Sequence, residues 1–260
     1  MAHYRRATPR AWQNPAMTLR LPAQAVLLLL ALLCAAVAHA QPTDRMLVFS
    51  KTAKFRHDAI PVAVAALQRV AAQEGLLADH SEDAGTFTAG NLARYRVVVF
   101  ASTTGDVLDE AQQQALEGFI RDGGGFVGVH AAADTEYDWP WYGQLVGAYF
   151  RNHPPGLQST HVQPEHDGRP VGTRWEVTDE IYNYRANPRP RVKVIATVDE
   201  REYEGGTMGA DHPIAWCHAF DGGRSWYTGL GHDARVYAMD DFLTQLRRGV
   251  RYAAGKSDDC

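Results

Sequence analysis

Short apolar runs alternate with helical patterns through the first half of this chain, and this alternation limits the fold more than any other feature. The runs occupy residues 46–50, 97–101 and 126–129, and each has the length of one buried strand. Residues 61–74 have apolar side chains at helical spacing, and a second helix is predicted after Asp109, which can cap it together with Gln112. This order predicts an α/β fold, with a parallel sheet and helices on both of its faces.

The remaining elements are less regular. Further strands are predicted at residues 76–80, 191–198, 213–220 and 225–230, and an amphipathic helix at 241–254. Residues 151–190 are rich in His, Pro, Tyr and Asn and show no clear periodicity. We therefore expect a long functional insertion within one domain rather than a second domain.

The first 40 residues have the layout of an export signal peptide. Four arginines precede an apolar stretch at residues 25–37, and Ala38-His39-Ala40 matches a cleavage site between small residues. This predicts a mature domain of residues 41–260 that is periplasmic or secreted and has no stable membrane anchor. A retained anchor is the alternative, although the apolar stretch is short for a membrane span. A start at Met17 would leave the signal layout complete.

Charge and cysteine content exclude some partners. Without the leader, 22 of the 26 basic residues remain against 30 acidic ones, a formal charge of −8. Nucleic acid and anionic membranes are therefore poor partners. Only Cys217 and Cys260 lie outside the leader, so one disulfide can form but a disulfide framework cannot. The sequence does not determine the oligomeric state, and a homo-oligomer is one of the options.

Polar residues follow the predicted strands. With right-handed crossovers, the loops after the three apolar runs meet at one edge of a parallel sheet. These loops carry His57, Asp58, Thr103, His130 and Asp134. We therefore expect a functional site at this edge.

His130 is the leading catalytic candidate. It ends a strand that follows three consecutive glycines, and the alanines after it allow close backbone packing around an exposed imidazole. The alternative is a strand-end histidine that bonds only to backbone, and the same two readings apply to His232. His57 is either a site residue or a solvated loop residue, and Asp58 either binds substrate or caps a helix.

Five separated blocks of sequence together resemble one known family. They are Phe55-Arg56-His57, residues 125–130, Asp179-Glu180-Ile181-Tyr182, residues 212–216 and residues 223–232. In this order they resemble the ThuA-like (trehalose utilisation) family, over nearly all of residues 45–255. The resemblance implies a flavodoxin-like fold similar to class I glutamine amidotransferases and a role in bacterial sugar catabolism, particularly of keto-disaccharides. It places His130 where amidotransferases carry a nucleophilic cysteine, and no cysteine lies nearby, which argues against glutamine hydrolysis.

Acidic and aromatic residues supply groups that suit sugar binding. The carboxylate of Glu180 can accept hydrogen bonds from sugar hydroxyls, and the rings of Tyr182, Tyr184 and Trp139 can cover the apolar face of a sugar. The alternatives are a surface turn at residues 179–182 and a core position for the tryptophan.

A divalent metal is the one cofactor that the sequence leaves open. We expect His153, His161 and His166 to be solvated, because their spacing fits no common ligand pattern. His57 and His232 are either ligands of such a metal or polar stabilisers of a developing enediolate.

These features predict an exported enzyme that acts on a small-molecule carbohydrate, a keto-sugar or keto-disaccharide. A ketone acidifies the neighbouring C–H bond, so His130 can act as general base with Asp134 or Glu180 as its orienting or acid partner. The reaction would be an elimination, a hydrolysis or an isomerisation. The alternative is a non-catalytic carbohydrate-binding or accessory module that uses the same cleft.

Overall fold

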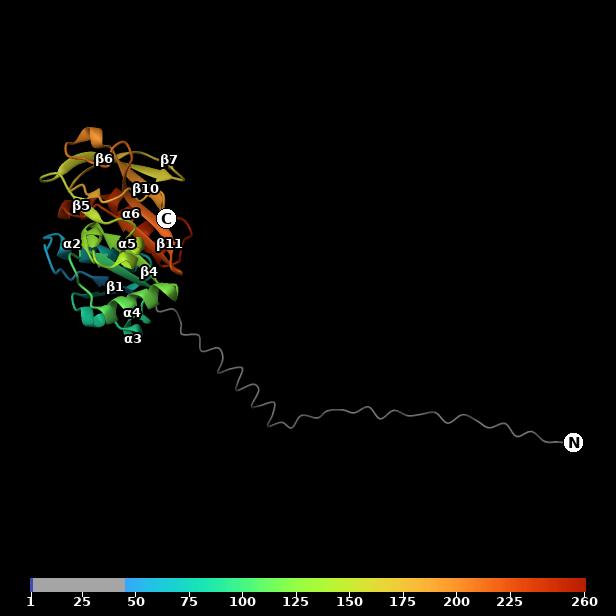
Figure 1. Ribbon diagram of the computed structural model, residues 1–260. Helices are drawn as coiled ribbons and strands as arrows, with labels where there is room; N and C mark the ends of the chain where they lie inside the picture. The colour runs from blue at the N-terminus through green and yellow to red at the C-terminus, as the bar shows by residue number, and fades with distance from the viewer. Residues whose placement is uncertain (2–44) are drawn as a thin grey trace. The chain divides into compact units, whose positions relative to one another are not determined.

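Five parallel strands form one half of a large mixed sheet (Figure 1). In spatial order they are β2 (Leu77–Ser81), β1 (Arg45–Phe49), β3 (Val97–Ala101), β4 (Gly125–Val129) and β12 (Gly223–Thr228). The fold is described from a computed structural model that covers Met1 and residues 45–260. Every residue of β3 and β4 is buried, which explains why these strands are continuous apolar runs in the sequence.

Helices cover both faces of this sheet, as predicted. On one face lie α2 (Ile60–Gln73) and α6 (Asp240–Ala253), which contact each other and share one hydrophobic cluster. The second cluster contains residues of α3 (Ala89–Leu92), α4 (Glu110–Arg121) and α5 (Pro140–Val146). Asp109 and Gln112 form the predicted capping box at the start of α4. The α/β class expected from the sequence is confirmed.

The other half of the sheet is antiparallel. It continues from β12 through β11 (His212–Phe220), β10 (Lys193–Val198) and β6 (Gln158–His166), and β6 also pairs with β7 (Arg169–Pro170) and β8 (Trp175–Asp179). Residues 151–190 thus contain strands that the sequence did not predict, because β6 alternates buried and partly exposed residues without a continuous apolar run. Figure 1 shows β6 and β7 at one end of this unit, far from α3 and α4.

Short elements complete the described part of the chain. The strands β5 (Phe150–Asn152) and β9 (Asn183–Tyr184) pair with each other outside the main sheet. The 3-10 helices are η1 (Ala84–Thr86), η2 (His130–Asp134), η3 (Glu200–Glu202) and η4 (Ala234–Ala238). Cys217 of β11 and Cys260 form a disulfide. Among the described helices, none has the length and apolarity needed to cross a bilayer. The predicted leader, apart from Met1, lies outside the described residues.

Candidate active site

His130 stands at the carboxyl end of β4, at the edge of the sheet where the sequence predicts the site. Its backbone lies in the left-handed region with φ of 50°, where a residue other than glycine is strained by ~1–3 kcal/mol. The sequence predicts an exposed imidazole here, but the structure buries His130 completely. The ring of Tyr182 lies over the imidazole, with 4.2 Å between the ring centres, and this packing excludes solvent.

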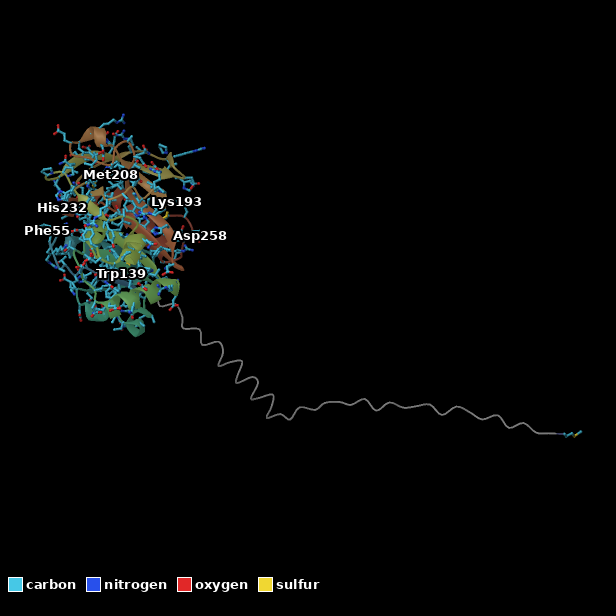
Figure 2. The ribbon with its side chains drawn as sticks, in the orientation of Figure 1. Phe55, Trp139, Lys193, Met208, His232 and Asp258 are labelled. Carbon is cyan, nitrogen blue, oxygen red and sulfur yellow. A yellow bond between two sulfur atoms is a disulfide. The ribbon has the colours of Figure 1, made fainter. Side chains whose placement is uncertain are left out.

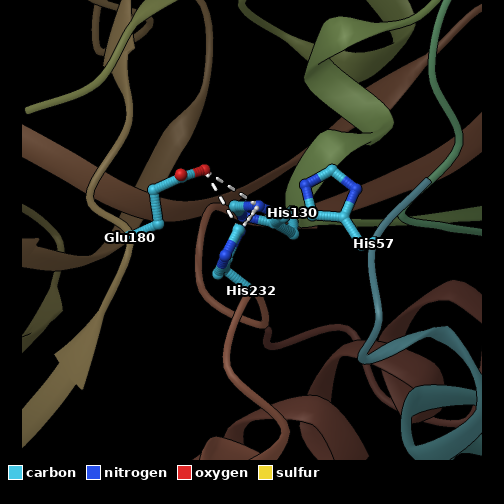
Figure 3. Close-up of side chains that lie close together, drawn as sticks. All are labelled: His57, His130, Glu180 and His232. Atoms are coloured by element: carbon cyan, nitrogen blue, oxygen red, sulfur yellow. Dashed lines mark hydrogen bonds and ion pairs between the residues drawn. The ribbon is translucent and has the colours of Figure 1, made fainter. Parts of the chain in front are cut away.

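The orientation of the His130 ring is fixed by one backbone carbonyl. Nδ1 lies 2.8 Å from the carbonyl oxygen of Gly229. A carbonyl only accepts, so Nδ1–H donates, and the neutral ring then carries its lone pair on Nε2. Nε2 lies 3.3 Å from Nδ1 of His232 and 3.5 Å from Oε2 of Glu180 (Figure 3).

Glu180 is the carboxylate at the centre of the site. Its Oε2 lies 3.2 Å from Nδ1 of His232, and its Oε1 lies 3.2 Å from Nδ1 of His153. Burial raises the pKa of Glu180, but hydrogen bonds and charge from His130 and His232 outweigh it and hold the pKa well below its usual range. The Glu180 hydrogen bond in turn raises the pKa of His232. One proton on Nδ1 of His232 therefore lies between two acceptors, Glu180 Oε2 and His130 Nε2.

His57 completes the group as a neutral side chain. Burial, followed by the charges of His130 and His232, lowers its pKa to about 3. Its ring centre lies 4.8 Å from that of His130 and 5.1 Å from that of His232. Within the described residues, its buried Nδ1 has no hydrogen-bond partner. The nitrogen is thus available to a ligand.

Asp179 positions the loop that carries His232. Its Oδ2 accepts a 2.6 Å hydrogen bond from the backbone of Gly231, and its Oδ1 accepts a 2.8 Å bond from that of Asp233. Gly231 has φ of 121°, and a Cβ there would lie 2.6 Å from the hydroxyl of Tyr237. The His232 loop is therefore fixed on both sides by buried groups.

A pocket of about 260 Å³ opens in front of these side chains. It is lined by Phe55, His57, Asp134, Phe150, His153, Glu180, Tyr182 and His232. His130 lies behind it. Asp58 lines a neighbouring depression that also includes Glu180 and His232. It does not cap α2, whose N-cap is Ala59 and lacks a side-chain hydrogen bond. The sequence offers Asp134 or Glu180 as the carboxylate partner of His130. Glu180 contacts His130, whereas Asp134 accepts a hydrogen bond from Tyr137.

Three other predicted site residues lie outside this pocket. Thr103 is buried and bonds to the hydroxyl of Thr135. The Tyr184 ring packs against Trp216 in the core. Trp139 stacks on Trp141 and lies well away from Phe55 and His232 in Figure 2.

Sequence reasoning missed the wall of the pocket formed by Phe150 and His153. His153 is exposed, as the sequence predicts, but its imidazole also contacts Glu180 and stacks on the ring of Phe150. These residues reach the site because β5 pairs with β9, which follows Glu180 by a few residues. The sequence contained no local signal for this long-range pairing.

Comparison with known proteins places the chain in a family. The family model for ThuA, trehalose utilisation, matches residues 45–253. The chain belongs to the ThuA family. A search of curated proteins finds no match.

Solved structures show that the ThuA fold is shared. A ThuA-like protein from Bacteroides uniformis superposes with a TM-score of 0.66 at 19% identity, over 84% of this chain and 94% of that one. One from Parabacteroides merdae gives 0.67 at 19% identity, over 84% and 91%. A β-galactosidase from Bacillus circulans gives 0.53 at 14% identity, over 85% of this chain but 32% of the enzyme. At these identities the likeness establishes the fold alone.

Proposed function

We propose that this ThuA-family chain is an exported enzyme of carbohydrate catabolism that acts on a keto-sugar or keto-disaccharide. The reaction begins with removal of a proton beside the ketone and proceeds to elimination, hydrolysis or isomerisation. The family's description as trehalose utilisation supports the substrate class. The aromatic side chains of Phe55, Phe150 and Tyr182 around the pocket supply surfaces for a sugar ring.

The observation that carries the proposal is the convergence of His130, His232 and Glu180. The facing ring nitrogens of the two histidines lie 3.3 Å apart, with the proton of His232 Nδ1 between them. The acceptor nitrogen of His232 is then Nε2, and the charge that this ring gains on protonation is shared with His130 and Glu180. His232 lines the pocket, and His130 lies buried behind it. We assign proton removal to this pair, with the ionised Glu180 stabilising the charged imidazole.

The chemistry follows from the position of the ketone. The pair takes the proton from the carbon next to the carbonyl, and the electrons of that C–H bond form an enediolate. In elimination these electrons form a carbon–carbon double bond while the bond to the glycosidic oxygen breaks, and the departing oxygen takes up a proton. Addition of water across the double bond completes a hydrolysis. An isomerisation is completed when the former carbonyl carbon takes up the proton and the neighbouring hydroxyl proton passes to the former carbonyl oxygen. The neutral His57 imidazole can donate a hydrogen bond to the developing oxyanion.

The aromatic lining also suits a second candidate function, a carbohydrate-binding or accessory module without turnover. Both candidates need Tyr182 and Glu180 as sugar contacts. The enzyme needs the histidine pair for proton removal, whereas the binding module does not.

The test is incubation of the purified protein with 3-keto-trehalose and related keto-glucosides, with glucose release as the readout. Substitution of His130 by Gln should reduce release by ~100- to 10,000-fold, the usual contribution of positioned acid–base groups. His166→Ala, at an exposed imidazole outside the pocket, is the matched control and should retain wild-type release. Sugar binding without release in all three proteins would overturn the enzyme and favour the binding module.

A further inference from the structure

We propose that His57, His130, His232 and Glu180 bind one divalent transition-metal cation, with Zn²⁺ as the reference ion. These side chains come from four separate segments of the chain. One ligand atom from each lies within 4.8 Å of all the others. Three of the residues are buried and His232 is partly exposed. This inference deepens the proposed function, on which it rests only for the use of the cation in catalysis.

The distances match those of a metal centre. The pairs among His130 Nε2, His232 Nδ1 and Glu180 Oε2 are separated by 3.3, 3.5 and 3.2 Å. Tetrahedral ligands with bonds of ~2.0–2.1 Å are separated by ~3.3 Å. A cation just out of the plane of this triangle would thus be at bonding distance from all three atoms without movement of the chain. His57, whose ligand atom lies within 4.8 Å of the others, would move toward the cation to complete the shell.

The donor set selects the class of cation. Three imidazoles and one carboxylate suit Zn²⁺, Fe²⁺, Co²⁺ or Ni²⁺. Ca²⁺ and Mg²⁺ prefer shells made of oxygen atoms, and this group offers one carboxylate. The cation would take the place of the proton on Nδ1 of His232, which lies between His130 Nε2 and Glu180 Oε2.

The surroundings of the four residues also fit a metal site. The second ring nitrogen of His130 donates to the Gly229 carbonyl, the type of outer contact that orients metal-bound histidines. Asp179 holds the His232 loop through two backbone hydrogen bonds. His57 contributes a buried Nδ1 that lacks a partner among the described residues.

A bound cation would change the role of His130. Because His130 is completely buried, its Nε2 does not contact a substrate in the pocket directly. In the metal-loaded protein His130 and His232 would be ligands rather than the proton-accepting pair, and the cation would supply Lewis-acid stabilisation of the enediolate oxygen of the proposed reaction. His153, Asp134 and Tyr182 are then the titratable side chains that line the pocket outside the ligand group, and proton removal would fall to one of them.

The test is a calorimetric titration of the chelator-treated protein with Zn²⁺, together with metal analysis of the protein as purified. We expect one Zn²⁺ per chain. His232→Ala and the isosteric Glu180→Gln should each weaken binding by more than ~100-fold, because loss of an outer-shell partner alone costs ~10- to 100-fold. His161→Ala is the matched control: it removes a surface imidazole that pairs with Glu202, and it should leave the affinity unchanged.

The outcomes separate this inference from the proposed function. Unchanged Zn²⁺ affinity in Glu180→Gln and His232→Ala, with thermal melts showing both folded, would overturn the metal site. So would the absence of stoichiometric binding to the wild-type protein. Stoichiometric Zn²⁺ without turnover of any keto-sugar would leave the metal site standing and reject the proposed substrate. Turnover that survives complete chelation would leave the proposed substrate standing and reject the use of the cation in catalysis.

Discussion

Asp179 and Glu180 are adjacent in the sequence but serve different parts of the site. The Asp179 carboxylate turns into the protein and accepts hydrogen bonds from the backbone of Gly231 and Asp233. The Glu180 carboxylate turns the other way and contacts His130, His153 and His232. This division follows from the strand geometry, because Asp179 ends β8 and successive side chains in an extended segment point to opposite sides. Asp179 thus positions the His232 loop, and Glu180 pairs with the imidazoles of the site.

Asp179→Asn should disturb the His232 loop without removing a group from the pocket. An asparagine offers one acceptor and one amide group that cannot accept, so one of the two backbone N–H groups loses its partner. We expect a loss of ~1–3 kcal/mol in the free energy of unfolding, the cost of one buried unsatisfied donor. We also expect weaker Zn²⁺ binding, because His232 moves.

Urea denaturation and the Zn²⁺ titration measure these two effects. Asp122→Asn is the control, since Asp122 is exposed at the end of α4 and lines neither the pocket nor the neighbouring depression. A folded Asp179→Asn protein with wild-type stability and Zn²⁺ affinity would show that the loop does not depend on this carboxylate.

The parallel part of the fold was predictable because its strands are buried on both faces. Such strands appear as continuous apolar runs, as in Val97–Ala101, and the capping pair Asp109 and Gln112 marks the start of α4. The antiparallel part was not predictable in the same way. In β6, partly exposed positions carry polar residues, so no apolar run marks the strand.

The site was predictable to the extent that it depends on strand ends. His57, His130 and His232 follow strands that meet at one edge of the sheet, and the structure brings them together. A strand end does not determine where the next side chain points, however. Thr103 follows β3 but bonds inward to Thr135. His153 reaches the pocket through the pairing of β5 with β9, which depends on contacts distant in sequence.

The disulfide between Cys217 and Cys260 should stabilise the domain without affecting the site. It closes a segment with a sequence separation of 43 residues. A disulfide over a loop of this length is expected to contribute ~2–4 kcal/mol. Cys260→Ser should therefore lower the unfolding free energy by this amount and leave Zn²⁺ affinity unchanged. Reducing agent should destabilise the wild-type protein but have no further effect on Cys260→Ser; equal sensitivity of both proteins would contradict the prediction.

His212 should make the stability of the domain fall in mild acid. Burial lowers its pKa, although Glu200 and Asp211 oppose this shift. Its ring faces the backbone carbonyl of Tyr182, the hydroxyl of Tyr203 and the carboxylate of Glu200. The unfolded chain takes up a proton near pH 6.5, whereas the folded protein takes it up only at lower pH. Stability contributed by the neutral ring is therefore complete above pH 6.5 and lost as the pH falls toward the folded pKa.

The readout is the difference in unfolding free energy between pH 7.5 and pH 5, measured with urea. His212→Gln should make this difference smaller, whatever it does to the stability at pH 7.5. The same measurement on His218→Gln is the comparison, because burial also lowers the pKa of His218. It shows how much of the acid sensitivity belongs to this second buried histidine. An unchanged difference in His212→Gln would assign the acid sensitivity to other groups.

Tyr182 should contribute to sugar binding through its ring. The ring lies 4.2 Å from that of His130 and 4.2 Å from that of Phe150, and it lines the pocket. Tyr182→Leu keeps an apolar side chain but removes the aromatic surface. Aromatic contacts contribute ~0.5–1.5 kcal/mol beyond burial, which corresponds to a ~2- to 12-fold increase in KM for a keto-glucoside.

The matched variant is Tyr182→Phe, which keeps the ring and should retain the wild-type KM. The separate values of KM and kcat distinguish two roles for the ring. A higher KM with unchanged kcat in Tyr182→Leu means that the ring binds substrate. A lower kcat with unchanged KM would contradict a role in substrate binding. It would mean that the ring holds His130 against Glu180 and His232, because loss of this packing disturbs the side chains that carry the chemistry.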